Sequence, residues 1–307
     1  MGSDLLDEFA EARQTFERAS EAVGYDMAQL CLEDPRAELD YTRFTQPALL
    51  THEVACYEAL LSLTKTDVLP LLTAGHSLGE YAALVVAQSL RFEDALKLVA
   101  ERGRLMGELG RGAMLATTLD LETATALAGK HYCGVAGCNL PDQTVVAGES
   151  PDLEALVADL SERFPRKRAV RLNTEGAFHT YLMIQAAQEF RAVLEKTPFG
   201  PPRIDVLSNY SGTPHQPDAE GIRSRLFFQL FNPVRWVDCM TAAIAGGVDA
   251  IVEFGGGIGN AEKPEGKRPN LESIVKKTLK WRQHEAQYLP AINVAGIRAA
   301  AEQLAED

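Results

Sequence analysis

The residues Gly75-His76-Ser77-Leu78-Gly79 form a G-x-S-x-G pattern between a short apolar run and a helical run. In a strand-to-helix turn of this kind, small residues let the chain reverse without a clash, and the serine hydroxyl projects above the edge of a sheet. The backbone N–H of Leu78, at the start of the helix, is placed to stabilise a developing oxyanion. The pattern therefore predicts that Ser77 is a catalytic nucleophile.

A nucleophilic serine needs a general base, and the chain has six histidines. His179 is favoured, because a loop residue where the chain enters a larger body can face the edge of its sheet. His76 lies inside the turn, where its ring should point away from the hydroxyl, and His52 lies in a helical stretch as a packing residue. The other three lie in polar, loop-like surroundings: His131, His215 and His284.

The elements that must hold Ser77 and His179 can be predicted from the spacing of apolar residues. Apolar residues three or four apart indicate helices, and short continuous apolar runs indicate buried strands. Because the two kinds alternate, the sequence predicts an α/β fold with helices on both faces of a sheet. The predicted helices are residues 5–23, 47–63, 79–89, 92–109, 153–164, 183–196 and 222–230. The predicted strands are residues 69–74, 113–118, 144–147, 169–172, 205–208 and 250–254.

One stretch, residues 112–179, follows a different order: strand, helix, strand, strand, helix, strand. Its two middle strands are joined by Leu140-Pro141-Asp142-Gln143, which has the composition of a hairpin turn. This order is typical of a ferredoxin-like unit. The sequence thus predicts a small ferredoxin-like subdomain at 112–179, inserted into a catalytic body formed by 1–111 and 180–307. A segment rich in Gly, Lys and Pro, residues 255–270, is predicted to be a surface loop.

Composition narrows the possible partners and compartment. The 307 residues carry 30 Lys and Arg against 43 Asp and Glu, a net charge of −13, which argues against nucleic acid and anionic membranes as general partners. No apolar stretch is long enough to span a bilayer, and the N-terminus lacks the features of a signal peptide. Five scattered cysteines without a C-x-x-C pair favour a reducing cytoplasm. The closest pair, Cys133 and Cys138, is expected to pack, and no metal site is predicted.

Five motifs in order resemble the malonyl-CoA:acyl-carrier-protein transacylases of fatty-acid and polyketide synthesis. The resemblance extends from about Ser3 to about Gly257 and implies an α/β-hydrolase-like body with an inserted ferredoxin-like subdomain. The motifs are Gln46-Pro47-Ala48-Leu49-Leu50, Gly75-His76-Ser77-Leu78-Gly79-Glu80, Arg102-Gly103-Arg104-Leu105-Met106, Gly176-Ala177-Phe178-His179 and Gln229-Leu230-Phe231-Asn232-Pro233-Val234-Arg235-Trp236.

The resemblance implies a ping-pong acyl transfer that needs no cofactor. Ser77 would take malonyl from malonyl-CoA and pass it to the phosphopantetheine thiol of acyl carrier protein, with His179 as the base. The carbonyl that orients this histidine would lie near Gln229.

Arg102 is the residue expected to select the acyl group. A guanidinium can hold a carboxylate through two parallel hydrogen bonds, and the free carboxylate distinguishes malonyl from acetyl. Arg104 cannot share that helix face and fits a solvated surface. By resemblance, Gln46 and His76 belong to the same substrate site, and Phe178 narrows the acyl pocket against methylmalonyl. One added methyl is worth only about 1–3 kcal/mol in a pocket, so we expect selectivity that is not absolute.

The sequence departs from the family in two places. The family's first strand and its Gly-Gln-Gly-Ser-Gln loop, which supplies a second oxyanion donor, are missing, so either the protein starts upstream of Met1 or it is a shortened relative. Phe254-Gly255-Gly256-Gly257 replaces the usual Gly-Pro-Gly, and an insertion at 262–269 follows. Two alternatives to transfer therefore remain: a serine thioesterase or hydrolase, and a non-catalytic module that binds the carrier.

Acyl carrier protein is acidic, so binding to a chain of charge −13 requires a local cluster of positive charge. Two basic clusters could supply it, and each could equally be a solvated face. One is Arg163, Arg166, Lys167, Arg168 and Arg171, and the other is Lys263, Lys267, Arg268, Lys276, Lys277 and Lys280.

Overall fold

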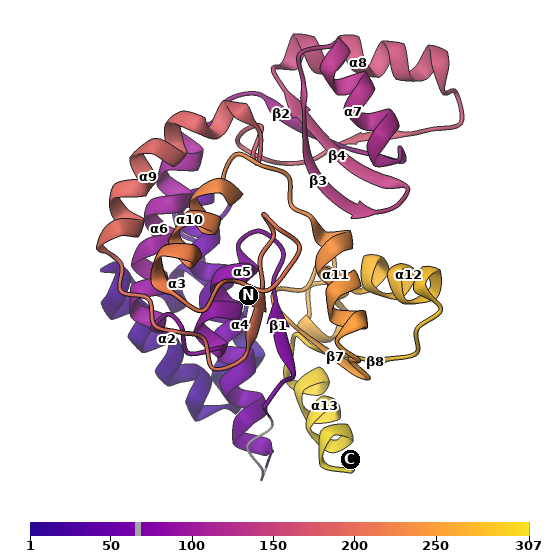
Figure 1. The fold of residues 1–307 in the computed structure, drawn as a ribbon. Coiled ribbons are helices and arrows are strands. Elements are labelled where there is room, and N and C mark those ends of the chain that lie inside the picture. The colour runs from indigo at the N-terminus through magenta and orange to yellow at the C-terminus, as the bar shows by residue number, and fades with distance from the viewer. Residues whose placement is uncertain (65–68, 307) are drawn as a thin grey trace.

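The computed structural model describes residues 1–64 and 69–306. In the body, two groups of helices enclose short parallel strands, and a small sheet with two helices of its own lies above them (Figure 1). The body helices are α1 (Ser3–Glu8), α2 (Ala10–Val23), α3 (Met27–Leu32), α4 (Thr42–Leu63), α5 (Gly79–Val86), α6 (Phe92–Leu109), α9 (Ile184–Lys196), α10 (Ala219–Gln229), α11 (Trp236–Ala245), α12 (Glu272–Arg282) and α13 (Val294–Glu306), with 3₁₀ turns η1 (Tyr181–Met183) and η2 (Pro264–Gly266).

The parallel strands of the body occur as two pairs. Strand β1 (Leu72–Ala74) pairs with β6 (Asp205–Leu207), and β7 (Ala250–Phe254) pairs with β8 (Gln287–Ala291). Within the described residues no ladder joins the two pairs. A large apolar core formed mainly by α2, α4, α5, α6 and α9 lies on one side, and a second core formed by α11 and α12 lies on the other. This arrangement confirms the predicted α/β fold with helices on both faces.

The small unit confirms the predicted ferredoxin-like order. Its elements are β2 (Ala113–Thr117), α7 (Leu121–Lys130), β3 (Gly134–Leu140), β4 (Gln143–Gly148), α8 (Ser150–Arg163) and β5 (Ala169–Arg171). All pairings in its sheet are antiparallel, in the order β3-β4-β2-β5, and a two-residue turn joins β3 to β4. The unit has its own apolar core between the sheet and its two helices. The exact domain boundaries, at 111/112 and 179/180, stay a prediction.

Backbone hydrogen bonds fix the small unit against the body. Cys138 N–H donates to the Val234 carbonyl at 2.8 Å, and Val234 N–H donates to the Ala136 carbonyl at 3.0 Å, so the segment before α11 extends the β3 edge. His179 N–H donates to the Leu230 carbonyl at 3.1 Å. These bonds bring the end of the inserted unit next to the end of α10.

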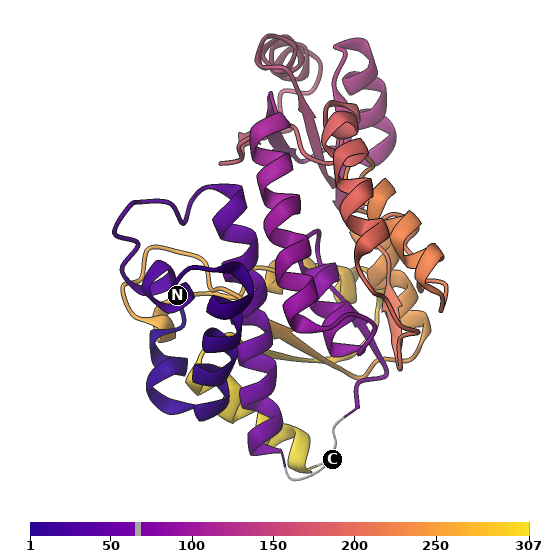
Figure 2. The same cartoon turned by 90° about the vertical axis from the view of Figure 1, so that its left-hand side faces the viewer.

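Two predicted helix boundaries were wrong. Phe9 has extended backbone angles and separates α1 from α2, although the apolar spacing continues across the break. Helix α4 begins at Thr42, five residues before the predicted start, and Pro47 lies inside it. Proline is favoured in the first turn of a helix, because it has no N–H to donate. Here the helix continues through it, and α4 packs along α6, as Figure 2 shows.

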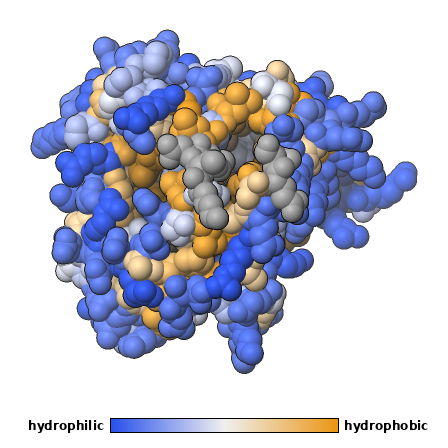
Figure 3. Space-filling view, turned by 90° about the horizontal axis from the view of Figure 1, so that it is seen from below, coloured by the Kyte–Doolittle hydropathy of each residue, from blue (hydrophilic) through white to orange (hydrophobic). Residues whose placement is uncertain are grey.

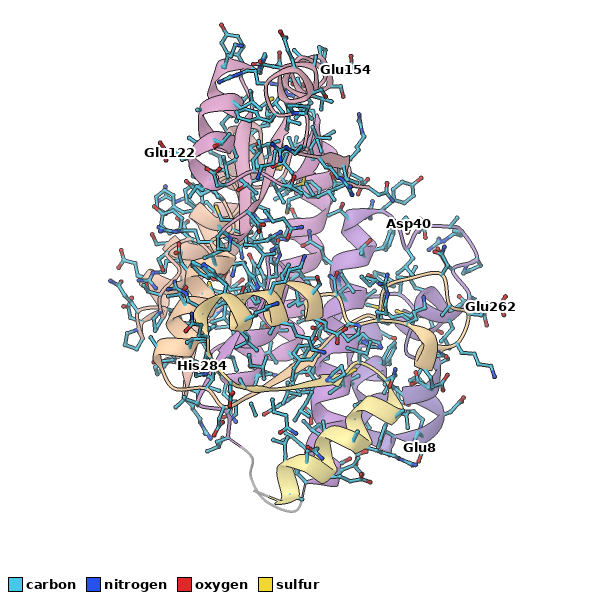
Figure 4. The ribbon with its side chains drawn as sticks, turned by 90° about the vertical axis from the view of Figure 1, so that its right-hand side faces the viewer. Glu8, Asp40, Glu122, Glu154, Glu262 and His284 are labelled. Atoms are coloured by element: carbon cyan, nitrogen blue, oxygen red, sulfur yellow. The ribbon has the colours of Figure 1, made fainter. Side chains whose placement is uncertain are left out.

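The segment 255–270 is largely exposed, as predicted, and Glu262 projects from it at the edge of the body (Figure 4). A two-way backbone pairing between Ile258 and Arg268 gives the loop its shape. All five cysteines are free thiols. In the described part of the chain, no group of side chains could hold a metal ion, and no helix has the length and apolar character needed to cross a membrane.

Apolar surface remains near the start of β1. Leu69 is 73% exposed and Leu71 is 62% exposed, just before the strand that leads to Ser77. Seen from below, hydrophilic residues cover the periphery of the molecule and hydrophobic surface shows at its centre (Figure 3). The opposite end of β1, which carries Ser77, adjoins the small unit.

Candidate active site

Ser77 lies in a tight turn between β1 and α5, as the sequence predicts. Its φ is +54°, in the left-handed region that side chains other than glycine rarely adopt. A Cβ on Gly75 would lie 1.9 Å from the carbonyl carbon of Gly79, so residue 75 must be glycine. At Gly79 an added Cβ would meet no described atom within 4 Å. Of the two flanking glycines, only the first is required by space.

The hydroxyl of Ser77 and the ring of His179 form a direct pair. Ser77 Oγ lies 2.7 Å from His179 Nε2, and His179 Nδ1 lies 2.8 Å from the backbone carbonyl of Gln229. A carbonyl can only accept, so Nδ1 carries the proton and Nε2 is free to accept one from the serine. Burial, with the nearby Arg102 cation, lowers the pKa of His179 to about 3. The ring is therefore neutral at physiological pH.

Arg102 reaches the same serine from α6. The residue is 1% exposed, and Nη2 lies 3.2 Å from Ser77 Oγ. Its other partners are neutral amides: Nη1 donates to Gln46 Oε1 at 2.8 Å, and Nη2 donates to Gln229 Oε1 at 3.0 Å. Nε has no partner among the described residues. A buried cation with no carboxylate in contact is costly, and its pKa is lowered by burial.

Arg104, two residues along the same helix, differs from Arg102 in its exposure and in the charge of its partners. It is on the outer face of α6, where it pairs with Glu101 at 2.6 Å and with Glu108. Gln46 Nε2 lies 3.5 Å from Met106 Sδ, so its amide oxygen is left to face Arg102. The two long helices α4 and α6 therefore meet at one polar point beside the nucleophile.

The remaining predicted residues are in or next to this site. Leu78 begins the first turn of α5, where helix geometry leaves its N–H without an acceptor in the same helix. His76 Nε2 lies 2.9 Å from Asn139 Oδ1 of β3, and its ring faces Trp236, so it bonds the small unit and not the serine. Phe178 packs against an apolar cluster that includes Met114, Ala136 and Leu182. Its role as a wall of the acyl pocket stays a prediction.

Sequence reasoning missed a buried polar group behind the nucleophile. Asn209, just after β6, accepts from Ser77 N–H at 2.6 Å and donates to the Gly75 carbonyl at 2.8 Å, so it fixes both sides of the turn. Glu80 accepts from Asn209 N–H at 2.9 Å and lies 2.7 Å from His215 Nε2. Glu80 is the only charged residue in α5, and this was the signal available in the sequence.

His215 lies in a loop beside a polar group, as expected, but its side chain is fully buried against Glu80. The burial escaped prediction because Glu80 is distant in sequence. His131 and His284 are half-buried, and they lie near Asp159 and the Val248 carbonyl. His52 packs inside α4 as expected, with Nδ1 3.6 Å from Cys56 Sγ.

Comparisons with known proteins agree with this geometry. A family model described as "Acyl transferase domain" matches residues 1–255. The polyketide biosynthesis malonyl CoA-acyl carrier protein transacylase BaeC of Bacillus velezensis is 37% identical over 261 residues, which are 84% of this chain and 88% of that protein. The chain therefore belongs to the acyl transferase family.

Solved structures identify the branch of that family. The crystal structure of malonyl CoA-acyl carrier protein transacylase from Clostridium perfringens has a TM-score of 0.87 and 31% identity, covering 100% of this chain and 93% of that one. A complex of a malonyl-transacylase with its type II PKS acyl-carrier protein has a TM-score of 0.87 and 32% identity, covering 99% and 94%. The chain is a member of the malonyl CoA-acyl carrier protein transacylases.

Proposed function

We propose that this protein transfers a malonyl group from malonyl-CoA to the phosphopantetheine thiol of acyl carrier protein, through a malonyl ester on Ser77. The observation that carries the proposal is the short contact between Ser77 Oγ and a neutral His179 Nε2, beside a buried Arg102 that has no carboxylate in contact. A serine, a base and a free cation in one place match an acyl group that carries its own carboxylate.

In the first half-reaction, Ser77 Oγ attacks the thioester carbonyl, and its proton moves to His179 Nε2. The N–H of Leu78 at the helix start stabilises the tetrahedral oxyanion. The C–S bond then breaks, and His179 returns the proton to the CoA thiolate. The Gln229 carbonyl, 2.8 Å from Nδ1, holds the ring in the required tautomer throughout.

Arg102 has two effects on this step. Its guanidinium forms hydrogen bonds with the malonyl carboxylate. Gln46 and His76 lie at the edges of the same substrate site. The same cation contributes to the low pKa of His179 in the free enzyme. A bound carboxylate neutralises the cation and removes that contribution, so the histidine becomes a stronger base once the correct acyl group is present.

In the second half-reaction, His179 takes the proton of the carrier's thiol, and the thiolate attacks the ester carbonyl of malonyl-Ser77. The ester C–O bond breaks, and His179 returns the proton to Ser77 Oγ. Each step conserves the acyl group and needs no cofactor.

Two exposed basic clusters are candidates for contact with an acidic carrier. All five residues of the first lie on or next to α8 and β5 of the small unit. The second lies on the 255–270 loop and on α12. We place the carrier on the small-unit cluster, because it lies on the sheet whose opposite edge strand, β3, contacts His76 at the nucleophile turn. A cytoplasmic location belongs to the same proposal, because free thiols persist in a reducing compartment.

The proposal is tested by measuring intact protein mass after incubation with malonyl-CoA. The wild type gains the mass of one malonyl group, and Ser77→Ala gains none. Ser89→Ala is the matched control, because Ser89 is also buried but bonds Gly200 away from the site. Undiminished malonyl loading on Ser77→Ala contradicts the proposal.

The same incubation, followed also for free malonate and for carrier binding, separates the two alternatives. A thioesterase or hydrolase releases free malonate at the rate of CoA release, even without carrier protein. A non-catalytic carrier-binding module binds carrier and forms no acyl-serine. Either result replaces acyl transfer as the function.

A further inference from the structure

Glu80 is a fully buried carboxylate one turn after the nucleophile. Three donors surround it: His215 Nε2 at 2.7 Å, Asn209 N–H at 2.9 Å and Gln229 Nε2 at 2.8 Å. Oε1 accepts from the histidine, and Oε2 accepts from the other two. This single side chain therefore joins α5, the end of α10 and the loop after β6.

The charge of Glu80 is not cancelled by its neighbour. His215 Nδ1 is buried and has no partner among the described residues. A protonated ring would bury an unsatisfied N–H there, whereas the neutral tautomer with hydrogen on Nε2 satisfies the bond to Glu80. The geometry thus fits a neutral His215 and an ionised Glu80.

Gln229 lies between this carboxylate and Arg102. Its Nε2 donates both to Glu80 Oε2 and to the Ser77 carbonyl, at 2.8 and 2.9 Å. Two acceptors on one side fix the amide, so Oε1 must face the other way, where it accepts from Arg102 at 3.0 Å. The buried cation therefore touches a neutral amide, and the balancing anion lies one residue behind it.

We propose that Glu80 is a positioning residue for acyl selectivity, which acts through the Gln229 amide to keep Arg102 aimed at the acyl carboxylate without pairing with it. The proposal rests on the proposed function. A direct Glu–Arg pair would compete with malonyl for the guanidinium. The arrangement seen here supplies the same counter-charge and leaves the guanidinium open to substrate.

The test is the ratio of malonyl-serine to acetyl-serine formation, from the two CoA thioesters, by intact mass. Glu80→Met keeps the chain length but has no acceptor, so the ratio falls about tenfold. Glu80→Gln retains an oxygen for Gln229 and Asn209 and keeps a ratio within about twofold of wild type. Its NH₂ faces His215 and requires the tautomer with a buried Nδ1–H, so this variant loses stability but not selectivity. A role confined to folding or to the nucleophile turn lowers both rates equally, and an unchanged ratio in Glu80→Met overturns the proposal.

A second background shows whether Glu80 acts through Gln229. Gln229→Met removes the amide and keeps the backbone carbonyl, and adding Glu80→Met to it produces no further change in the ratio. A full additional loss contradicts the relay. If Glu80→Met does not fold, Glu80→Asp serves in its place, because its shorter carboxylate cannot reach all three donors, and an unchanged ratio again overturns the proposal.

The control is Asp159→Asn, which alters a histidine–carboxylate pair in the small unit. It leaves both rates unchanged. If the wild type forms no acyl-serine at all, the proposed function fails. If it does so and the ratio is insensitive to Glu80, only this inference fails.

Discussion

Two regions of the molecule each hold a histidine against a carboxylate, and their surroundings differ. In the body, His215 and Glu80 are both fully buried, and the carboxylate receives only neutral donors. In the small unit, His131 Nε2 lies 2.9 Å from Asp159 Oδ2, and their side chains are 16% and 11% exposed. Lys130 reaches the same oxygen at 2.6 Å.

The contrast shows how the buried charge of Arg102 is kept available for a substrate carboxylate. In the small unit, cations touch the carboxylate directly and lower the pKa of Asp159 to about 2. In the body, Glu80 and Arg102 are separated by the Gln229 amide, so neither is consumed by an ion pair. Direct contact between opposite charges stabilises the carboxylate of the small unit, whereas separation in the body leaves Arg102 able to bind a substrate carboxylate.

The largest expected difference between the regions is in stability. Glu80→Met leaves Arg102 as an uncompensated buried cation, so the free energy of unfolding falls by about 3–5 kcal/mol. Asp159→Asn lowers the urea midpoint by less, because Lys130, its main partner, is 57% exposed and pairs with exposed side chains contribute little. Denaturant titration of both variants checks this. Equal urea midpoints for the two variants would show that the two carboxylates contribute equally to stability, and would contradict this prediction.

The second largest effect is expected on selectivity between malonyl and acetyl groups. Arg102→Ala lowers kcat/KM for malonyl loading about a hundredfold, because a charge-assisted hydrogen-bonded pair is lost, and lowers acetyl loading much less. Arg104→Ala is the matched control from the outer face of α6 and changes neither rate. Equal losses for malonyl and acetyl in Arg102→Ala would remove the carboxylate role of that residue.

A smaller difference is expected in pH dependence. With the pKa of His179 near 3, the base stays neutral on acidification, and kcat/KM for loading changes less than about threefold between pH 7 and pH 5. A histidine of ordinary pKa would lose about 25-fold over that range. A pH–rate profile with an acid limb centred near pH 6.5 is the contrary outcome.

The same low pKa makes a prediction for stability with a definite sign. The folded state binds the His179 proton more weakly than the unfolded state does. Stability from this group is therefore complete above the unfolded pKa of about 6.5 and is lost as the pH falls from there toward 3. Unfolding midpoints measured across this window should decline on acidification, and by less in His179→Gln.

The smallest effect concerns carrier docking. Replacing Arg166 and Arg168 with Glu raises the KM for carrier protein several-fold at low salt and less at high salt, since steering by exposed charges is screened. The same changes at Lys277 and Lys280 on α12 leave that KM unchanged. The reverse pattern would move the docking face to the C-terminal cluster.

Much of this site was predictable from the chain alone. Ser77 was found because its turn is local: the strand, two glycines and helix lie within a few residues. The order of elements from 112 to 179 gave the small unit for the same reason. His179 was favoured from its loop position alone. Arg102 needed the resemblance, because it approaches the serine from a distant position and no local pattern marks it.

What escaped prediction is non-local. Glu80 and His215 are 135 residues apart in sequence, and neither neighbourhood indicates the other. Asn209 follows a strand of three residues, which is too short to show where its side chain points. The break at Phe9 escaped because apolar periodicity continues across it, whereas Pro47 suggested a helix start that tertiary packing overrides.

The central claim is transfer through an acyl-serine, and one measurement tests it most directly. The malonyl-loaded protein is freed of CoA and mixed with carrier protein that bears phosphopantetheine, and the masses of both proteins are followed in time. The account predicts that the malonyl group leaves Ser77 and appears on the carrier, with little free malonate. A loaded protein that keeps its malonyl group, or loses it to water at the same rate with and without carrier, would contradict the account.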